Sequence, residues 1–540
     1  MSKIQVEVRF TDKLESIRVG GQDMEIPNAI KTKSVEEWFE PAAGRVNWDG
    51  LGAEIKAMGF SGEKDAVYSF QFNGPEDKKR EFMNCVECFC LGEEAQQETQ
   101  EETEQDYLQD ASDFQQVGNA EMAFQKYMVA ASDYGSPEAQ FEVARCYQNG
   151  TGVEKNEENA VVWYKKAAEQ GYAEAQKKLG DCYNYGTGVA KDLEQAFECY
   201  RKAAEQGNAR AQNNLGVCYM NGNGVTKDPV QAAEWYARAA EQGLARAQYN
   251  LGYCYKTGEG VEKDPKKAAM WCEKAAEQGI AVAQYYLGCC YEDGKGVTKD
   301  LARAAEWYRK AAESGNVKAQ FALGKCYYDG NGTEMNYSEA VKWYRKAAEQ
   351  GDADAQNSLG YYYERGEGVA KDLGKAIEWY RKSAEQGCAE AQYTLAELYA
   401  NGYGVAQNKE EAVKWYRKSA EQGYADAQYN LAELLYNVAG FLSWKDGEEA
   451  FKWYQKAAKQ GHAGAQDSLG LCYEETDMEM EIYWGMGMGV EKDSAKAVEW
   501  YRKAAEQGLD SAQYHLGRCY EGGKGVTKDL TKAAEWYQKA

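Results

Sequence analysis

Histidine is almost absent from this chain, and the shortage restricts the chemistry that the chain can support. The 540 residues include two histidines, His462 and His515. Two are too few for a histidine-based catalytic triad or for a zinc site of the usual composition. Cys85, Cys88 and Cys90 have a metal-like spacing, but no second Cys or His cluster accompanies them, and on a helix Cys90 would point away from the other two. We therefore expect no catalytic residues, no metal site and no cofactor.

The chain also lacks long apolar runs and an excess of basic charge. No stretch approaches the 18 consecutive apolar residues of a membrane-spanning helix, and the start, MSKIQVEVRF, lacks the basic and apolar regions of a secretory signal. The net charge of −24 argues against nucleic acid, whose phosphates require a basic surface, and it favours basic partners. The 15 cysteines are then expected to be reduced thiols, which indicates a cytoplasmic protein.

What the chain has in abundance is a repeat. Glycines that close successive segments, most of them within an Ala-Glu-Gln-Gly motif, recur at intervals of 36 residues and later at longer ones. They are Gly135, Gly171, Gly207, Gly243, Gly279, Gly315, Gly351, Gly387, Gly423, Gly461 and Gly508. A period of this length marks supersecondary units that bury their apolar faces only by stacking on one another. The long surface of such an array favours a binding function.

Each unit begins with the pattern of an amphipathic helix. From Ala209 to Met220, apolar side chains recur at helical spacing and predict one buried stripe. Gly216 lies inside this helix, and its recurrence predicts that another helix crosses there too closely to leave room for a Cβ atom. A column of cysteines recurs on the buried stripe, where small or medium apolar residues pack. It comprises Cys146, Cys182, Cys218, Cys254, Cys290, Cys326, Cys472 and Cys519.

The second half of each unit predicts another helix. Gly222 and Gly224 can adopt the positive φ that a tight connection requires, and Asp228 is a typical N-cap. Glu-to-Lys pairs four residues apart, such as Glu306 and Lys310, are expected to form ion pairs on the exposed side. The unit is therefore predicted to be a helix–turn–helix hairpin.

The combined pattern, A-x-A-Q-x-x-L-G-x-x-Y-x-x-G-x-G-V-x-K-D…A-x-x-W-Y-x-K-A-A-E-Q-G, resembles the Sel1-like repeat, a relative of the tetratricopeptide repeat with a longer internal loop. The resemblance covers about eleven units over residues 136–540, the last one cut short at Ala540. It implies a mainly α fold, an α-solenoid in a right-handed superhelix whose first helices line the concave side, and a role as adaptor or scaffold. A hairpin at 103–135, with Gly118 in a tight turn, resembles a tetratricopeptide-type capping unit. The acidic stretch 93–106 is expected to be a linker or the start of that hairpin's first helix.

Positions that differ between units predict where a partner binds. Three such positions, spaced i, i+3 and i+7 on each first helix, form one exposed stripe, which we call the variable stripe. We interpret it as the lining of a groove for a peptide or a protein, although exposed positions also vary without any function. A neighbouring column that includes Phe141, Tyr249 and Tyr393 is mostly aromatic, which indicates packing between helices. The predicted partner-binding residues of the stripe are Arg145, Asn149, Lys178, Asp181, Tyr185, Asn214, Val217, Asn221, Asn250, Tyr253, Tyr286, Asp293, Lys325, Asp329, Tyr361, Arg365, Glu397 and Asn401.

Two adjacent irregular units interrupt the pattern. One replaces the glycine-rich loop with NVAGFLSWKDG, and the other gains the eleven residues EETDMEMEIYW before GMGMGV. Eleven residues are close to three helical turns, so the first helix can lengthen without rotating its buried stripe. We expect either a docking spur or mutual packing of the two insertions. The residues of the spur are Phe441, Trp444, Met478, Met480, Tyr483 and Trp484.

Residues 1–92 do not share the repeat. Alternating apolar residues at 4–10 and 68–72 predict strands, and helices are expected to begin near Ser34 and Gly74. This region is predicted to be a small α+β domain, and it resembles no family that we identify.

These features favour a non-enzymatic adaptor whose groove holds a protein ligand while the N-terminal domain engages a second one. The alternative is a regulatory subunit whose repeats recruit an enzyme and whose N-terminal domain senses a ligand. A hydrolase is a third and less favoured class. The oligomeric state is not indicated by the sequence.

Overall fold

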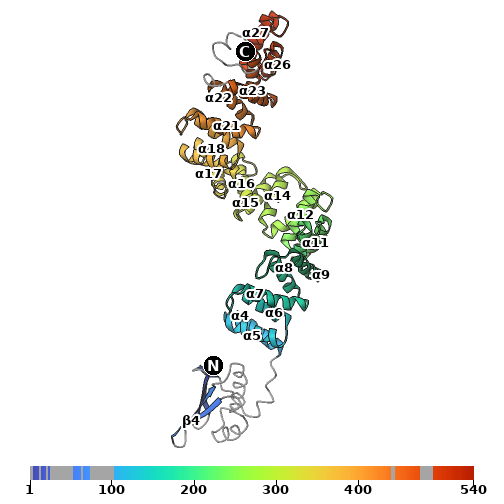
Figure 1. Cartoon of the computed structure of the whole chain (residues 1–540), viewed down its shortest axis with the longest axis vertical. Helices are drawn as coiled ribbons and strands as arrows, with labels where there is room; N and C mark the ends of the chain where they lie inside the picture. The colour runs from blue at the N-terminus through green and yellow to red at the C-terminus, as the bar shows by residue number, and fades with distance from the viewer. Residues whose placement is uncertain are drawn as a thin grey trace. The chain divides into compact units, whose positions relative to one another are not determined.

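The computed structural model describes strands at 4–10, 14–19, 22–24, 53–61 and 65–72, and the stretches 103–438, 444–474 and 490–540. The chain divides into two compact units, Met1–Asp192 and Leu193–Ala540. Helical hairpins follow one another along each unit (Figure 1).

From residue 137 onward, first and second helices of the repeat alternate along the chain. The first helices are α6 (Pro137–Asn149), α8 (Ala173–Tyr185), α10 (Ala209–Asn221), α12 (Ala245–Thr257), α14 (Ala281–Asp293), α16 (Val317–Asp329), α18 (Ala353–Arg365), α20 (Ala389–Asn401), α22 (Ala425–Val438), α24 (Ala463–Glu474) and α27 (Asp510–Gly522). The second helices are α7 (Glu157–Glu169), α9 (Leu193–Glu205), α11 (Pro229–Glu241), α13 (Pro265–Glu277), α15 (Leu301–Glu313), α17 (Tyr337–Glu349), α19 (Leu373–Glu385), α21 (Lys409–Glu421), α23 (Trp444–Lys459), α26 (Ser494–Glu506) and α28 (Leu530–Lys539). The predicted array of helical hairpins is therefore confirmed.

The helix boundaries follow the predicted capping residues. Helix α10 ends at Gly222, whose φ of 75° allows its amide to bond back to the carbonyl of Cys218. Helix α11 begins after Asp228, whose side chain accepts hydrogen bonds from the backbone amides of Val230 and Gln231. Both predicted signals are confirmed.

The glycine inside the first helix marks the predicted close crossing. A Cβ atom at Gly216 would lie 2.6 Å from the ring of Tyr236, on the second helix of the same hairpin. This distance is shorter than any normal contact, so the tyrosine ring occupies the space that a side chain would need. The paired helices of a hairpin are thus held together at a glycine–tyrosine contact.

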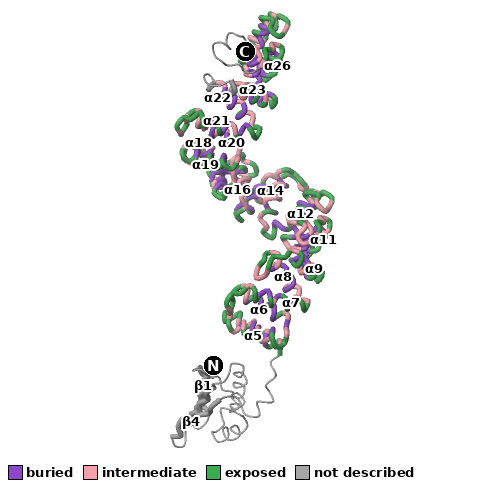
Figure 2. Tube along the Cα trace, in the orientation of Figure 1, coloured by how far each residue is buried: buried purple, intermediate pink, exposed green. Residues whose placement is uncertain are grey.

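The apolar core consists of clusters that extend across neighbouring hairpins. One cluster of buried residues extends from Ala340 to Cys472, across helices α17 to α24. In Figure 2 buried segments follow the inner sides of the helices and exposed segments gather at the loops. The cysteine column is part of the buried core, as the burial of Cys218 and Cys254 shows. Burial raises the pKa of both thiols to about 11. These thiols stay protonated and act as packing groups, as predicted.

A ladder of glutamine pairs adds polar contacts inside the array, and the sequence did not reveal it. Gln248 donates a hydrogen bond to the carbonyl of Ala240 in the preceding helix, and its own side-chain oxygen accepts one from Gln278, 2.8 Å away. The same side-chain pair joins Gln140 to Gln170, Gln212 to Gln242, Gln320 to Gln350, Gln356 to Gln386, Gln392 to Gln422, Gln428 to Gln460 and Gln466 to Gln507. Each pair satisfies a buried amide oxygen that would otherwise lack a partner.

One rung of the ladder is missing at Gln284. The residue thirty positions later is Ser314, whose hydroxyl donates to the carbonyl of Lys310 instead. The side-chain oxygen of Gln284 is consequently buried without a hydrogen-bond partner. We expect Ser314→Gln to restore the rung and to stabilise the α14–α15 hairpin by about 1 kcal/mol.

The reverse change is the matched control for this prediction. Gln350→Ser should orphan the oxygen of Gln320 in the next hairpin and cost about 1–3 kcal/mol. Local amide exchange in the α14–α15 and α16–α17 hairpins measures both effects. Faster exchange in Ser314→Gln than in the wild type would show that the unpaired side-chain oxygen of Gln284 does not destabilise the α14–α15 hairpin.

The second helices carry tryptophans stacked by cations as well as ion pairs of the predicted kind, one of which joins Glu448 to Lys452 at 2.7 Å on α23. The ammonium of Lys310 lies 4.0 Å from the ring centroid of Trp307, and the pair that we predicted between Lys310 and Glu306 is wrong. A cation at i+3 can lie over an indole face and cover it with its alkyl stem, which an ion pair with Glu306 would prevent. The arrangement recurs at 3.7–4.4 Å at Trp163, Trp235, Trp271, Trp343, Trp379, Trp415, Trp453, Trp500 and Trp536.

Two hairpins of the irregular region are joined by a histidine, which gives this junction a pH dependence. His462 caps α24: its Nδ1 accepts a hydrogen bond from the backbone amide of Ala465 at 3.0 Å, and its ring stacks on Tyr429 of α22. The other ring nitrogen lies 3.4 Å from a carboxylate oxygen of Asp426. Burial lowers the pKa of His462, with Asp426 opposing the shift.

We expect the α22–α24 junction to loosen on acidification. Because folding favours the neutral imidazole, its contribution is complete above the ordinary histidine pKa of about 6.5 and is lost as pH falls through the lower folded-state value. Amide exchange in the first turn of α24, corrected for intrinsic rates, should reveal the loss between pH 7 and 5. His462→Asn keeps a capping side chain that does not titrate, so it should abolish the pH dependence. Equal pH dependence in both proteins would exclude this histidine as the cause.

The first hairpin and the N-terminal sheet complete the described structure. Helices α4 (Glu104–Gln116) and α5 (Ala120–Asp133) occupy the predicted hairpin, with Gly118 at a φ of 80° between them. The tetratricopeptide-type assignment of that hairpin stays a prediction. The strands are β1 (Ile4–Phe10), β2 (Leu14–Val19), β3 (Gln22–Met24), β4 (Ala53–Ser61) and β5 (Asp65–Phe72). They form one antiparallel sheet in the order β3-β2-β1-β5-β4.

The two segments predicted as strands lie within β1 and β5. The helices expected near Ser34 and Gly74 lie outside the described residues, as does most of the acidic stretch 93–106. The α+β class of residues 1–92 therefore stays a prediction.

Candidate functional site

The variable stripe lies on the first helices, and none of its predicted residues is buried. The i+7 position is exposed in every unit where we predicted it. It comprises Asn149, Tyr185, Asn221, Asp293, Asp329, Arg365 and Asn401. Of the middle position, Arg145, Tyr253 and Lys325 are exposed, and Asp181, Val217, Tyr361 and Glu397 are partly covered. Within each structural unit, the stripe thus has side chains that are accessible to a partner.

The first position of the stripe is half-buried because it also touches the neighbouring first helix. Lys178, Asn214, Asn250 and Tyr286 all have this intermediate exposure. The side-chain amide of Asn250 on α12 donates to the side chain of Asn213 on α10 at 2.9 Å. The ammonium of Lys256 lies 4.4 Å from the ring centroid of Tyr286. These residues contribute to packing between hairpins as well as to the exposed face.

The charged residues of the stripe form local ion pairs. Arg145 contacts Glu142 at 2.8 Å, Asp293 contacts Lys295 at 2.7 Å, and Asp181 accepts from Lys177 at 2.6 Å. Arg365 similarly contacts Glu367 at 2.7 Å. Exposed pairs of this kind contribute about 0–1 kcal/mol each. A partner that offers its own charges can therefore replace them at little cost.

The aromatic column beside the stripe packs between hairpins, as predicted. The ring of Tyr393 on α20 lies 5.8 Å from that of Tyr416 in its own hairpin and 5.2 Å from that of Tyr424 at the start of the next one. Its hydroxyl donates to Glu397 at 2.8 Å, and burial raises the pKa of this carboxyl. Glu397, a predicted stripe residue, is thus tied to the packing column.

The exposed face of the first helices is hollowed between α14, α16 and α18. The cavity measures about 350 Å³ and is lined by Tyr285, Glu292, Phe321 and Ala322 among others. Ala322, at the first stripe position, lines the cavity, and Ser358 occupies the same position in the next hairpin. Most other units have larger residues there, for example Tyr286 before the cavity and Thr394 after it.

Sequence reasoning placed Cys289, Ala322 and Lys325 at stripe positions, with Lys325 among the predicted binding residues, but it did not predict the cavity. The cavity takes its walls from three successive first helices, so no single unit contains it. The available signal was the succession of two small residues, Ala322 and Ser358, in a column of larger ones.

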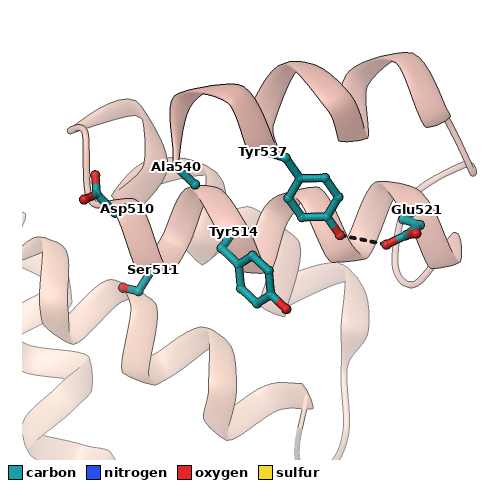
Figure 3. Close-up of a pocket in the computed structure, with 6 residues that line it drawn as sticks. All are labelled: Asp510, Ser511, Tyr514, Glu521, Tyr537 and Ala540. Atoms are coloured by element: carbon teal, nitrogen blue, oxygen red, sulfur yellow. Dashed lines mark hydrogen bonds between the residues drawn. The ribbon is translucent and has the colours of Figure 1, made fainter.

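A second hollow lies at the end of the last hairpin (Figure 3). It is lined by Asp510, Ser511, Tyr514, Glu521, Tyr537 and Ala540, and the hydroxyl of Tyr537 donates to Glu521 at 2.7 Å. Tyr514 belongs to the aromatic column, whose other members pack between hairpins, so this hollow has the surface of a packing face.

The predicted docking spur cannot be placed. Phe441, Met478, Met480, Tyr483 and Trp484 lie outside the described residues, and Trp444 is the first residue of α23 without a described side chain. Cys85, Cys88 and Cys90 lie outside them too. Within the described stretches there is no group of three or more His, Cys, Asp or Glu side chains that could hold a metal ion. None of the helices in those stretches is long and apolar enough to cross a membrane.

Comparison with known proteins identifies the repeat. The Sel1 repeat model matches residues 137–172, 173–208, 209–244, 245–280, 281–316, 317–352, 353–388, 389–424, 425–462, 483–509 and 510–540. The chain is 42% identical to a protective antigen present in uropathogenic Escherichia coli strains that displays an SLR fold, over 77% of this chain and 86% of that one, with a TM-score of 0.69. It is 32% identical to a Sel1 repeat protein from Oxalobacter formigenes, over 60% of this chain and 93% of that one, with a TM-score of 0.46.

No curated protein matches the chain significantly. Repeat proteins of this kind generally act as scaffolds for protein interactions. The eleven matched segments begin and end with the hairpins of the structure, apart from the irregular tenth unit, and they cover most of the sequence. The chain belongs to the Sel1 repeat family.

Proposed function

We propose that this protein is a non-enzymatic scaffold or adaptor that binds a peptide or protein partner along the variable stripe. One observation carries the proposal: the packing columns of the repeat stay nearly constant and buried, while the stripe on the same helices changes in every unit and stays accessible. A solenoid with only a structural role has no need of differing tyrosine, arginine and acidic side chains along one face.

The stripe contains side chains of the types that dominate binding energy at protein interfaces. Tyrosine and arginine are enriched among such residues because they bury large areas and also form directed polar contacts. Tyr253 is 44% exposed. The guanidinium of Arg365 lies 5.3 Å from the ring centroid of Tyr361, which holds the two side chains together on the surface of α18. We expect Tyr253, Tyr361 and Arg365 to contribute more than their neighbours.

The proposed compartment is the cytoplasm. The free thiols of the described residues, at least one in most hairpins, support a reducing environment. The proposed partner is a protein and not a nucleic acid, because the net charge of −24 repels phosphates.

Affinity capture with cross-linking mass spectrometry tests the proposal on the full chain. We expect wild-type protein to cross-link partners through the first helices, and the double variant Tyr253→Ala/Tyr361→Ala to lose most of that recovery. The matched control is Val230→Ala/Met270→Ala, which removes two exposed apolar side chains from second helices. Equal recovery by the stripe variant and the wild type would contradict the proposal.

The same experiment separates the alternatives. If the captured partner is an enzyme whose activity responds to a ligand of residues 1–92, the protein is a regulatory subunit. A turnover screen on the purified chain tests for hydrolase activity, and turnover that survives removal of residues 1–92 would contradict a non-enzymatic role.

A further inference from the structure

We propose that the cavity between α14, α16 and α18 binds a lysine or arginine side chain of an extended, basic segment of the partner. The inference rests on the proposed function and specifies the chemistry of its ligand. It is carried by a fixed carboxylate in the lining of the cavity, by the aromatic rings that also line it, and by the stripe residues Ala322 and Lys325 in that lining.

One carboxylate that lines the cavity, that of Glu292, is held in a fixed position. The hydroxyl of Tyr308 donates to Oε2 of Glu292 at 2.5 Å, and Tyr308 itself is only 1% exposed. This hydrogen bond uses one oxygen of Glu292 and leaves lone pairs for a ligand. A charge that is half-buried among aromatic rings attracts a cation more strongly than the same charge in open water.

The side walls are aromatic and rigid. The ring of Tyr285 lies 5.8 Å from that of Tyr308, and the ring of Phe321 lies 5.5 Å from that of Tyr344. Packing thus holds both wall rings in place before any ligand arrives. Their faces suit the methylene stem of a lysine or arginine and add a cation–π attraction to its head group.

The rim carries charges of both signs, and their positions decide which ligand is favoured. Asp352 and Asp354 lie at the start of α18, where Asp352 also caps the helix by accepting from the amide of Ala355. Lys318 and Lys325 are exposed on α16. Exposed lysines are screened by solvent and free to move aside, whereas the half-buried Glu292 is held by its hydrogen bond from Tyr308. With three carboxylates against two lysines, the cavity favours a positive guest.

The size and place of the cavity indicate a side chain of a longer ligand. A volume of about 350 Å³ is at the lower end for small-molecule sites and suits one long side chain. Ala322 and Lys325 belong to stripe positions, so a peptide backbone that follows the exposed stripe passes directly over the opening. A guest bound in this way anchors the peptide in register with the hairpins.

Short peptides with one varied side chain test the inference on the full chain. The probes are Gly-Gly-X-Gly-Gly peptides with X as arginine, lysine, citrulline or glutamate, and binding is measured by saturation-transfer NMR. We expect the arginine and lysine peptides to bind at least fivefold more tightly than the citrulline and glutamate peptides. Ala322→Phe, which fills the cavity, should weaken arginine-peptide binding at least tenfold, and Glu292→Gln at least fivefold.

Val230→Phe is the control, because it adds the same ring at an exposed position of second helix α11, outside both the variable stripe and the cavity. It should leave peptide binding unchanged, and circular dichroism should show equal helix content in all variants. Equal binding of the arginine and citrulline peptides would overturn the inference. So would a preference for the glutamate peptide, which the rim lysines would produce, or unchanged binding in Ala322→Phe.

The two proposals can fail separately. If proteins cross-link to the first helices but the arginine peptide does not bind, the basic-segment inference is wrong and the scaffold proposal stands. If the arginine peptide binds and Ala322→Phe abolishes its binding, but no protein cross-links to the stripe, the cavity assignment stands and the scaffold proposal is wrong.

Discussion

Replacing Gly260 with alanine is expected to destabilise the contact between two neighbouring hairpins by about 2–5 kcal/mol. Gly260 lies in the loop between α12 and α13 and has a φ of 78°. A Cβ atom there would lie 1.9 Å from the carbonyl oxygen of Pro229, the first residue of α11 in the preceding hairpin. The left-handed conformation alone costs a non-glycine residue about 1–2 kcal/mol. The remainder arises because backbone, unlike a flexible side chain, cannot move away without separating the hairpins.

Two other glycines provide a graded control series. Gly279 has a φ of 87° and open space around its missing Cβ, so Gly279→Ala should show the conformational cost alone. Gly404 occupies the same loop position as Gly260, but the nearest atoms belong to the side chains of Ile377 and Leu373, which can shift. Local amide exchange should therefore rank the losses in the order Gly279, Gly404, Gly260. A loss at Gly260 no larger than that at Gly279 would show that the loop does not anchor the hairpins.

Leu215→Ala is expected to cost about 2–5 kcal/mol, because it leaves a cavity in a closely packed core. Leu215 on α10 has no exposed surface. Each hairpin contacts mainly its neighbours, so the loss should appear as faster exchange in helices α9 to α12 while α20 and α21 keep their protection.

The control is Asn221→Ala, an exposed change on the same helix that should alter exchange little. Hydrogen exchange is the appropriate measurement because an array of many hairpins does not unfold as a two-state system. A uniform loss of protection along the whole chain would contradict the description as a nearest-neighbour array.

The repeat could be predicted from sequence because its signals are local and occur many times. Gly222, Asp228 and the apolar spacing of α10 each specify the conformation of a few consecutive residues, and most units repeat them, some with Asn in place of the capping Asp. The structure confirmed these boundaries to within one residue at the end of α10. The close crossing at Gly216 was predictable for the same reason, since an unfavourable glycine that recurs in most first helices indicates a close contact.

Contacts between units were harder to predict. The ladder that joins Gln248 to Gln278 links positions thirty residues apart, and both glutamines look like ordinary polar surface residues in the sequence. The docking of Gly260 on Pro229 likewise joins different hairpins. The pairing of Lys310 was wrong because the helical spacing allows both Glu306 and Trp307 as partners, and sequence alone does not rank them.

The candidate site was predicted in outline only. Exposure of the stripe follows from helical geometry, so its i+7 residues lie in solvent as expected. The half-burial of Asn250 and Tyr286 depends on how closely neighbouring first helices approach, and the cavity at Ala322 depends on three helices at once. Neither the half-burial of these residues nor the cavity can be predicted from the sequence of a single unit.

The repeated tryptophan–cation stacks make tryptophan fluorescence an intrinsic probe of unfolding along the array. Ten of the fourteen indoles occupy the same position in ten different second helices, each beneath a lysine or arginine head group. Tryptophan emission lost during stepwise denaturation therefore reports the release of these ten helices. The helix that carries Cys199 at this position has no tryptophan, so its melting does not change tryptophan emission directly.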